Sequence, residues 1–76
     1  MTITDDVYST RETFKDLLAN EETKAVIDEY LPGVEDHPMF GMLKGFVVED
    51  LAQIAPDQFN EKMLYALNKE LTKVKK

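Results

Sequence analysis

The chain lacks most of the residues from which metal and cofactor sites are built. Its 76 residues include no cysteine, one histidine, one serine and three isolated glycines. It can therefore form neither a disulfide nor a cysteine-based metal site, and it has no glycine-rich phosphate-binding loop. The cluster Glu35-Asp36-His37 holds three potential ligands, but consecutive side chains in a loop diverge, and zinc would need a further nitrogen or sulfur donor. We expect no metal and no cofactor, and interpret Asp36 as the N-cap of a helix that Pro38 opens.

Long apolar runs and an excess of positive charge are also missing. The chain has no run of eighteen apolar residues that could span a membrane, and residues 1–10 lack the basic and apolar regions of a signal peptide. Residues 1–61 hold fourteen acids and four bases, whereas residues 62–76 hold one acid and five lysines, for a total net charge of −6. This acidic body would repel a phosphate backbone. We expect no nucleic-acid partner and no membrane partner, and a cytoplasmic location.

Adjacent acidic residues are frequent, but none of the pairs indicates a catalytic site. Paired carboxylates act in acid–base catalysis when one of them is buried. Here each pair lies at the start or on the exposed face of an expected helix. The pairs are Asp5-Asp6, Glu21-Glu22, Asp28-Glu29 and Glu49-Asp50. We expect that the chain is not an enzyme.

Size and charge also resemble those of acyl carrier proteins. However, the only serine, Ser9, is followed by Thr10-Arg11 and not by the sequence that holds a phosphopantetheine arm. We therefore reject this resemblance.

Apolar residues recur at helical spacing in five segments, and no strand pattern is present. A capping box at Ser9 and Glu12 predicts the first helix, while Asn20 and Asn60 are suitable N-caps for the second and the last. The expected helices cover residues 10–19, residues 21–31, a short segment opened by Pro38, a short segment over residues 48–55, and residues 61–74. The predicted fold is all-α, a compact orthogonal bundle of about five helices, two of them short.

The domain organisation is simple. Residues 1–8 have mixed polarity without periodicity, which predicts a flexible N-terminal arm, although Ile3, Val7 and Tyr8 could pack against the body. Residues 9–76 are expected to form a single helical domain.

Four large, soft side chains lie within eight residues and form the most interesting segment for binding: Met39, Phe40, Met42 and Phe46. They could line an adaptable groove for a protein partner, or they could simply fill the core of a small domain. On the short helix Phe40 lies opposite Met39 and Leu43, so it is the residue expected to stay exposed. An exposed Phe40 could equally drive a weak homodimer, and both monomer and weak homodimer stay open.

Several stretches of the sequence together resemble a known module. They are FKDLLAN (residues 14–20), AVIDEYLPG (residues 25–33), HPMFGM (residues 37–42) and VEDLAQIAP (residues 48–56). In this order they resemble a small helical module at the C-terminal tails of bacterial glycoside hydrolases and some esterases. The likeness covers roughly residues 13–74. It implies a non-catalytic role, and no active-site residue carries over.

These observations favour a non-catalytic accessory or protein-interaction module associated with a carbohydrate-active hydrolase. Its partner would be another protein or a parent enzyme domain. The alternative is a small domain that binds an apolar ligand between the methionine-rich segment and the last helix. A third possibility, a small helical enzyme, would require carboxylates that are buried together.

Overall fold

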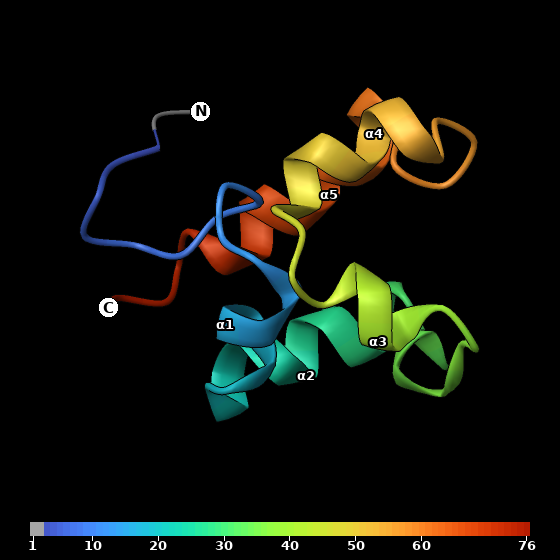
Figure 1. Ribbon diagram of the computed structural model, residues 1–76. Coiled ribbons are helices and arrows are strands. Elements are labelled where there is room, and N and C mark those ends of the chain that lie inside the picture. Colours follow the sequence, from blue (N-terminus) through green and yellow to red (C-terminus); the bar gives the residue numbers. More distant parts are fainter. Residues whose placement is uncertain (1–2) are drawn as a thin grey trace.

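The computed structural model describes residues 3–76, and these form five α-helices and two short 3-10 helices (Figure 1). The helices are α1 (Phe14–Leu18), α2 (Glu21–Tyr30), η1 (Val34–Asp36), α3 (Phe40–Leu43), η2 (Val48–Asp50), α4 (Leu51–Ile54) and α5 (Glu61–Leu71). No strand occurs in this part of the chain. Its radius of gyration is 11.3 Å, and about 11 Å is typical of a folded domain of this length. The predicted compact all-α fold is confirmed.

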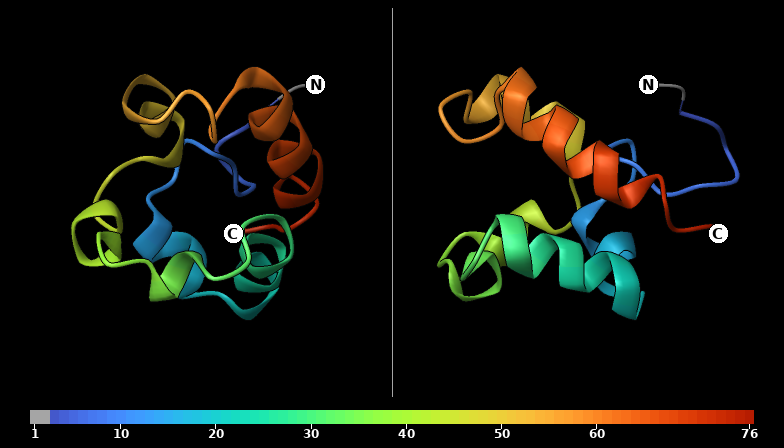
Figure 2. Two further views of the ribbon diagram at one scale, coloured as in Figure 1. Left: turned by 90° about the vertical axis from the view of Figure 1, so that its right-hand side faces the viewer. Right: turned by 180° about the vertical axis from the view of Figure 1, so that it is seen from behind.

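The helices lie in two layers. Figures 1 and 2 show α1, α2 and α3 on one side of the molecule and α4 and α5 on the other. Within the first layer α1 packs against α2, and α2 contacts α5 of the second layer. No helix within residues 3–76 combines the length and the apolar composition that crossing a bilayer would require.

The core forms where the two layers meet, and Phe14 lies at its centre. The Phe14 ring makes edge-to-face contacts with Phe40 at 6.3 Å and with Phe59 at 6.1 Å between centroids, the geometry that aromatic pairs prefer. Other core side chains come from α1, α2, η2, α4 and α5. The buried cluster is Phe14, Leu17, Ile27, Val48, Leu51, Phe59, Leu67 and Leu71. Five of the seven helical elements thus contribute buried side chains to a single core.

The two longest helices begin where the sequence predicts. Asn20 accepts hydrogen bonds from the Glu22 and Thr23 amides, and Asn60 accepts one from the Met63 amide at 2.9 Å. Such caps satisfy amides that have no partner within the helix. The α4 prediction is also close, because η2 and α4 together form one helical stretch over residues 48–54.

The predicted start of the first helix is wrong. Ser9 and Glu12 do make one of the two expected capping contacts, since the Glu12 carboxylate accepts from the Ser9 amide at 3.2 Å, but the Ser9 hydroxyl accepts from the Arg11 amide. However, α1 begins only at Phe14, with Thr13 as its N-cap. The reason is a contact between segments that are distant in sequence. The Thr10 carbonyl accepts a hydrogen bond from the Glu49 amide at 2.8 Å, and the Glu12 carbonyl accepts one from the Val48 amide at 3.0 Å. Residues 10–13 therefore pair with residues 47–49 instead of forming a helical turn.

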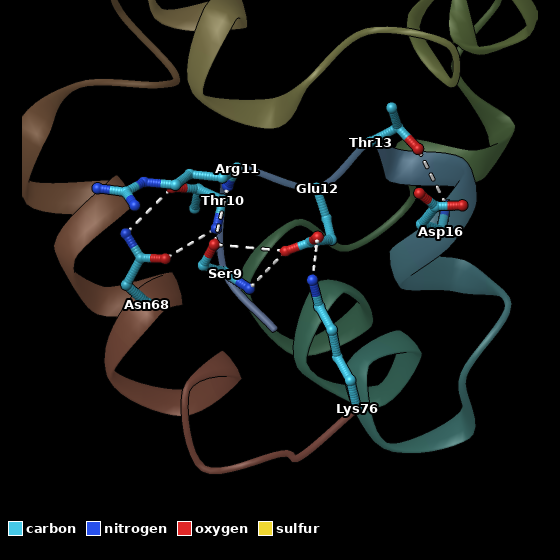
Figure 3. A network of polar contacts seen from close by, with 8 residues as sticks. All are labelled: Ser9, Thr10, Arg11, Glu12, Thr13, Asp16, Asn68 and Lys76. Carbon is cyan, nitrogen blue, oxygen red and sulfur yellow. Dashed lines mark hydrogen bonds and ion pairs between the residues drawn. The ribbon is translucent and has the colours of Figure 1, made fainter. Parts of the chain in front are cut away.

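A buried polar contact ties the N-terminal segment to α5 (Figure 3). Asn68 accepts from the Thr10 amide at 2.8 Å and donates to the Thr10 hydroxyl at 3.0 Å. Both residues are almost completely buried. Each polar group therefore finds its partner in the other residue, as burial requires.

The two ends of the chain are paired. The Tyr8 amide donates to the Val74 carbonyl at 3.1 Å, and the Lys76 amide donates to the Asp6 carbonyl at 2.9 Å. The Lys76 ammonium also lies 2.6 Å from the Glu12 carboxylate, and this hydrogen bond raises the pKa of Lys76 (Figure 3). Residues 1–2 of the predicted arm lie outside the described residues, while residues 6–8 lie alongside the C-terminal residues.

Candidate functional site: an apolar groove between the two layers

A concave surface lies at one end of the molecule. One wall is formed by the end of α2 and residues 31–39, and the other by the end of α4, residues 55–60 and the start of α5. Figure 1 shows these two segments at the same end of the molecule, one in each layer, and the left view of Figure 2 faces that end. The site is therefore built from residues about 15 to 30 positions apart in the sequence.

Three adjoining hollows make up this surface, which we call the apolar groove. The first, about 380 Å³, lies between Leu31 and Met63, and the second, about 300 Å³, between Leu31 and Phe59. The third, about 200 Å³, lies between Met39 and Ile54. Gln58 lines all three hollows. Sites for drug-sized ligands are typically about 300–1,000 Å³. The first two hollows thus lie at the lower end of this range, and the third lies below it.

Large apolar side chains stand exposed on both walls. Met39 is 51% exposed and Ile54 is 60% exposed, and both line the third hollow. Beneath them Leu51 and Phe59 are buried and form its floor. Exposed apolar surface that gathers at a hollow is typical of a binding site, whereas single scattered apolar residues are ordinary.

The structure separates the four residues that the sequence predicted for docking. Met39 lines the groove. Phe40, expected to be exposed, instead packs against Phe14 in the core, so that expectation is wrong. Met42 and Phe46 are 64% and 38% exposed but line none of the three hollows. A docking role for these residues stays a prediction, and only Met39 belongs to the groove.

His37 has a structural part in the groove wall. Its Nδ1 accepts a hydrogen bond from the Met39 amide at 3.1 Å, just before α3. The predicted cap, Asp36, is wrong: Met39 is the N-cap residue of α3, and Asp36 ends η1. Because Pro38 has no N–H, the Met39 amide is the first free donor in this segment, and the imidazole two residues earlier reaches it.

The described residues around the groove do not gather into a metal site. Among residues 3–76, no three His, Asp or Glu side chains come together as metal ligands. Glu35 points instead to Lys24, at 3.5 Å, and the Lys24 pKa is raised by its hydrogen bond to Asp28 and by the nearby Glu35. The carboxylates of the four adjacent acidic pairs are all exposed. What the groove offers chemically is apolar contact.

Two oppositely charged residues line the apolar groove. Asp57 and Lys62 both line its first hollow, and both are exposed. No acidic residue, lysine or arginine lines the other two hollows. The groove is thus an apolar surface with one carboxylate and one ammonium group at its first hollow.

Sequence reasoning missed Phe59 and Gln58, which shape the groove from the second wall. Neither lies in a helix, so helical periodicity gave no signal. One available signal was a hydrophobic staple, since Phe59 directly precedes the N-cap Asn60 and Leu64 occupies the matching position in the helix. Both apolar residues do belong to the core or pack against it.

Comparison of the chain with protein-family models, with curated proteins and with solved structures finds no match. The resemblance to the tails of glycoside hydrolases therefore stays a prediction, and the function is argued from the groove.

Proposed function

We propose that this chain is a non-catalytic interaction module that binds an apolar segment of another protein in the apolar groove. The observation that supports the proposal most directly is the pair of exposed side chains Met39 and Ile54, which face the same hollow from opposite walls. Both would lose contact with water on binding, which favours association by about 25 cal/mol per Å² of apolar surface. Methionine adapts its shape to different partners, as such a surface needs.

The shape of the groove favours a protein segment over a small ligand. Three open hollows in a row can each take one apolar side chain of the same segment, as when an amphipathic helix lies in a groove. An apolar ligand held in one place would leave the other two hollows exposed. The alternative, a domain for a small apolar ligand, keeps some support from the first hollow, since about 380 Å³ falls within the range of small-molecule sites.

The setting of this module follows from the resemblance stated for its sequence. We propose that the partner is a domain of a carbohydrate-active hydrolase, and that the chain acts as its accessory module. A chain without cysteine is compatible with a reducing compartment, and we propose a cytoplasmic location.

A neutral probe tests the proposed function. The probe is a fluorescent 14-residue peptide made of leucine and glutamine, with leucine at positions spaced i, i+3, i+4 and i+7 along it. Its affinity for the full chain is measured by fluorescence anisotropy. We expect binding that weakens at least tenfold in the double variant Met39→Gln/Ile54→Gln, because each lost anchor is worth on the order of 1 kcal/mol.

The matched control is Met42→Gln/Tyr65→Gln. These residues are 64% and 61% exposed, so the control removes a similar amount of exposed apolar surface outside the groove. It should bind the peptide like the original chain. Equal weakening in both variants would contradict the proposal. So would a lack of binding to the peptide together with binding of 1-octanol, which would support the small-ligand alternative.

A further inference from the structure

We propose that the helix bound in the apolar groove carries one basic and one acidic residue on one flank of its apolar face. These two residues meet Asp57 and Lys62, which both line the first hollow. The inference rests on the proposed function and adds to it the charge pattern of the partner. It follows from the position of two opposite charges at one hollow, and not from the net charge of the chain.

The two charged residues lie on the same wall of the groove. Asp57 belongs to the loop before α5, and Lys62 lies in the first turn of that helix. The opposite wall of the first hollow is formed by Tyr30 and Leu31. Glu61, next to Lys62 in the sequence, lines none of the three hollows. A segment in the first hollow therefore meets one carboxylate and one ammonium group on a single side.

The domain itself leaves both charges without a partner. Within residues 3–76, neither Asp57 nor Lys62 takes part in any of the ion pairs. They also do not pair with each other, although they line the same hollow. Both residues are exposed. Each can therefore take an opposite charge from a partner without giving up an existing ion pair.

The first hollow is one end of the groove. It shares Tyr30, Leu31 and Gln58 with the second hollow, but only Gln58 with the third, which lies between Met39 and Ile54. The only acidic residue and the only lysine among the described lining residues therefore stand at the same end.

This placement selects the sequence and the direction of the bound helix. Leucines at helical spacing form a similar apolar stripe in both directions, so the hollows alone do not distinguish the two ends of a helix. Complementary charges across an interface fix the register, whereas like charges oppose binding. A base and an acid at positions i and i+4 lie one turn apart on the same face of a helix, so both can face the same wall.

A second copy of the chain is a poorer occupant. Two grooves that faced each other would bring one concave surface against another and leave the hollows unfilled. The apolar residues Leu67 and Leu71 of the longest helix are buried in the core of their own domain. That helix is therefore not free to enter the groove of a neighbour.

The test uses two 14-residue peptides of identical composition and the full chain at low ionic strength. Leucine occupies peptide positions 4, 7, 8 and 11, as in the neutral probe. Lysine and glutamate occupy peptide positions 1 and 5, in one order or the other, and glutamine fills the rest. We expect the affinities of the two peptides, measured by fluorescence anisotropy, to differ by about three- to tenfold, the scale of one or two exposed ion pairs.

A charge-swapped chain locates the effect. The double variant Asp57→Lys/Lys62→Asp keeps the net charge and exchanges the two signs, so the preferred peptide order should reverse. Differences in peptide helicity cancel, because both chains meet the same two peptides. The single variants Asp57→Asn and Lys62→Gln should each reduce the difference between the two orders.

The matched control is Lys15→Asp/Asp16→Lys. It exchanges two exposed charges on α1, which line no part of the groove and take part in none of the ion pairs within residues 3–76. This control should keep the preference of the original chain.

The outcomes separate this inference from the proposed function. If both orders bind the original chain equally, or if the preference stays the same in the charge-swapped chain, the inference is wrong while the groove still binds apolar helices. Displacement of the peptides by free leucine at millimolar concentration would also overturn it, because leucine is a small zwitterion that meets both charges without a helix. Self-association of the chain that blocks the peptides would point to a second copy instead. Loss of binding by both peptides and by the neutral probe would contradict the proposed function, and this inference with it.

Discussion

Replacing Asn68 with alanine should destabilise the domain more than any other substitution of a polar residue in α5. The Asn68 side chain makes two hydrogen bonds to Thr10, one to the amide and one to the hydroxyl. Thr10 is 1% exposed. After the substitution its amide would stay buried without a partner, because water cannot easily reach it.

The expected magnitude follows from these contacts. An unsatisfied buried donor costs about 1–3 kcal/mol, and the second lost hydrogen bond adds about 1 kcal/mol. We therefore expect the free energy of unfolding to fall by about 2–4 kcal/mol. A domain of this length has roughly 4–11 kcal/mol in total, at about 0.05–0.15 kcal/mol per residue. The variant should fold, with a clearly lower midpoint of unfolding.

Urea denaturation followed by circular dichroism at 222 nm measures this loss. The control is Lys69→Ala, the next residue on the exposed face of α5, which should change stability by less than about 0.5 kcal/mol. Thr10→Val keeps the shape of its side chain but removes the hydroxyl, and a double-mutant cycle with Asn68→Ala should show a coupling of about 0.5–3 kcal/mol. An Asn68→Ala protein as stable as the Lys69→Ala protein would refute the structural role of this contact.

Three further predictions concern the core, a short helix and an ion pair. Phe40→Ala should lower the free energy of unfolding, measured by urea denaturation, by about 2–3 kcal/mol because the Phe40 ring packs on the core. Met42 is exposed, so Met42→Ala should lower it by less than about 0.5 kcal/mol. Similar losses in the two variants would contradict the orientation of α3. Gly41→Ala should stabilise the domain by about 0.5–1 kcal/mol, since glycine weakens a helix and nothing lies within 4 Å of the added carbon; a lower melting temperature would contradict this. The hydrogen bond from Lys73 holds the pKa of Glu70 below its ordinary value of 4.5. The pair therefore stabilises the fold above pH 4.5, and the stabilisation is lost as the pH falls through the lowered pKa. Thermal melts should show Glu70→Gln slightly less stable than the original chain at pH 7 and equal to it in strong acid; a difference that persists in acid would argue against the pair as its cause.

Local sequence signals were sufficient to predict the helices whose ends depend on neighbouring residues. Asn20 and Asn60 cap α2 and α5 as their sequence positions predict, because each cap needs only amides two or three residues away. The apolar periodicity likewise placed Leu67 and Leu71 in the core. These features depend on contacts within one or two helical turns.

Contacts between distant segments set the limits of prediction. Glu12 accepts from the Ser9 amide as predicted, but no helix starts there, because residues 10–13 pair with residues 47–49. The orientation of Phe40 depends on the position of Phe14, which no local pattern specifies. The groove depends on the meeting of residues 31–39 with residues 55–60, so the sequence could indicate Met39 but not Ile54 as its counterpart.

The most direct test of the account is a map of where an apolar helix touches the chain. Amide NMR spectra of the ¹⁵N-labelled full chain, titrated with the leucine–glutamine peptide, provide that map. We predict that the largest shifts occur on both walls of the groove, at Val34, Met39, Ile54 and Gln58, with little change at Met42 and Phe46. Shifts centred on Met42 and Phe46, or none at saturating peptide, would contradict the claim that the apolar groove is the binding surface.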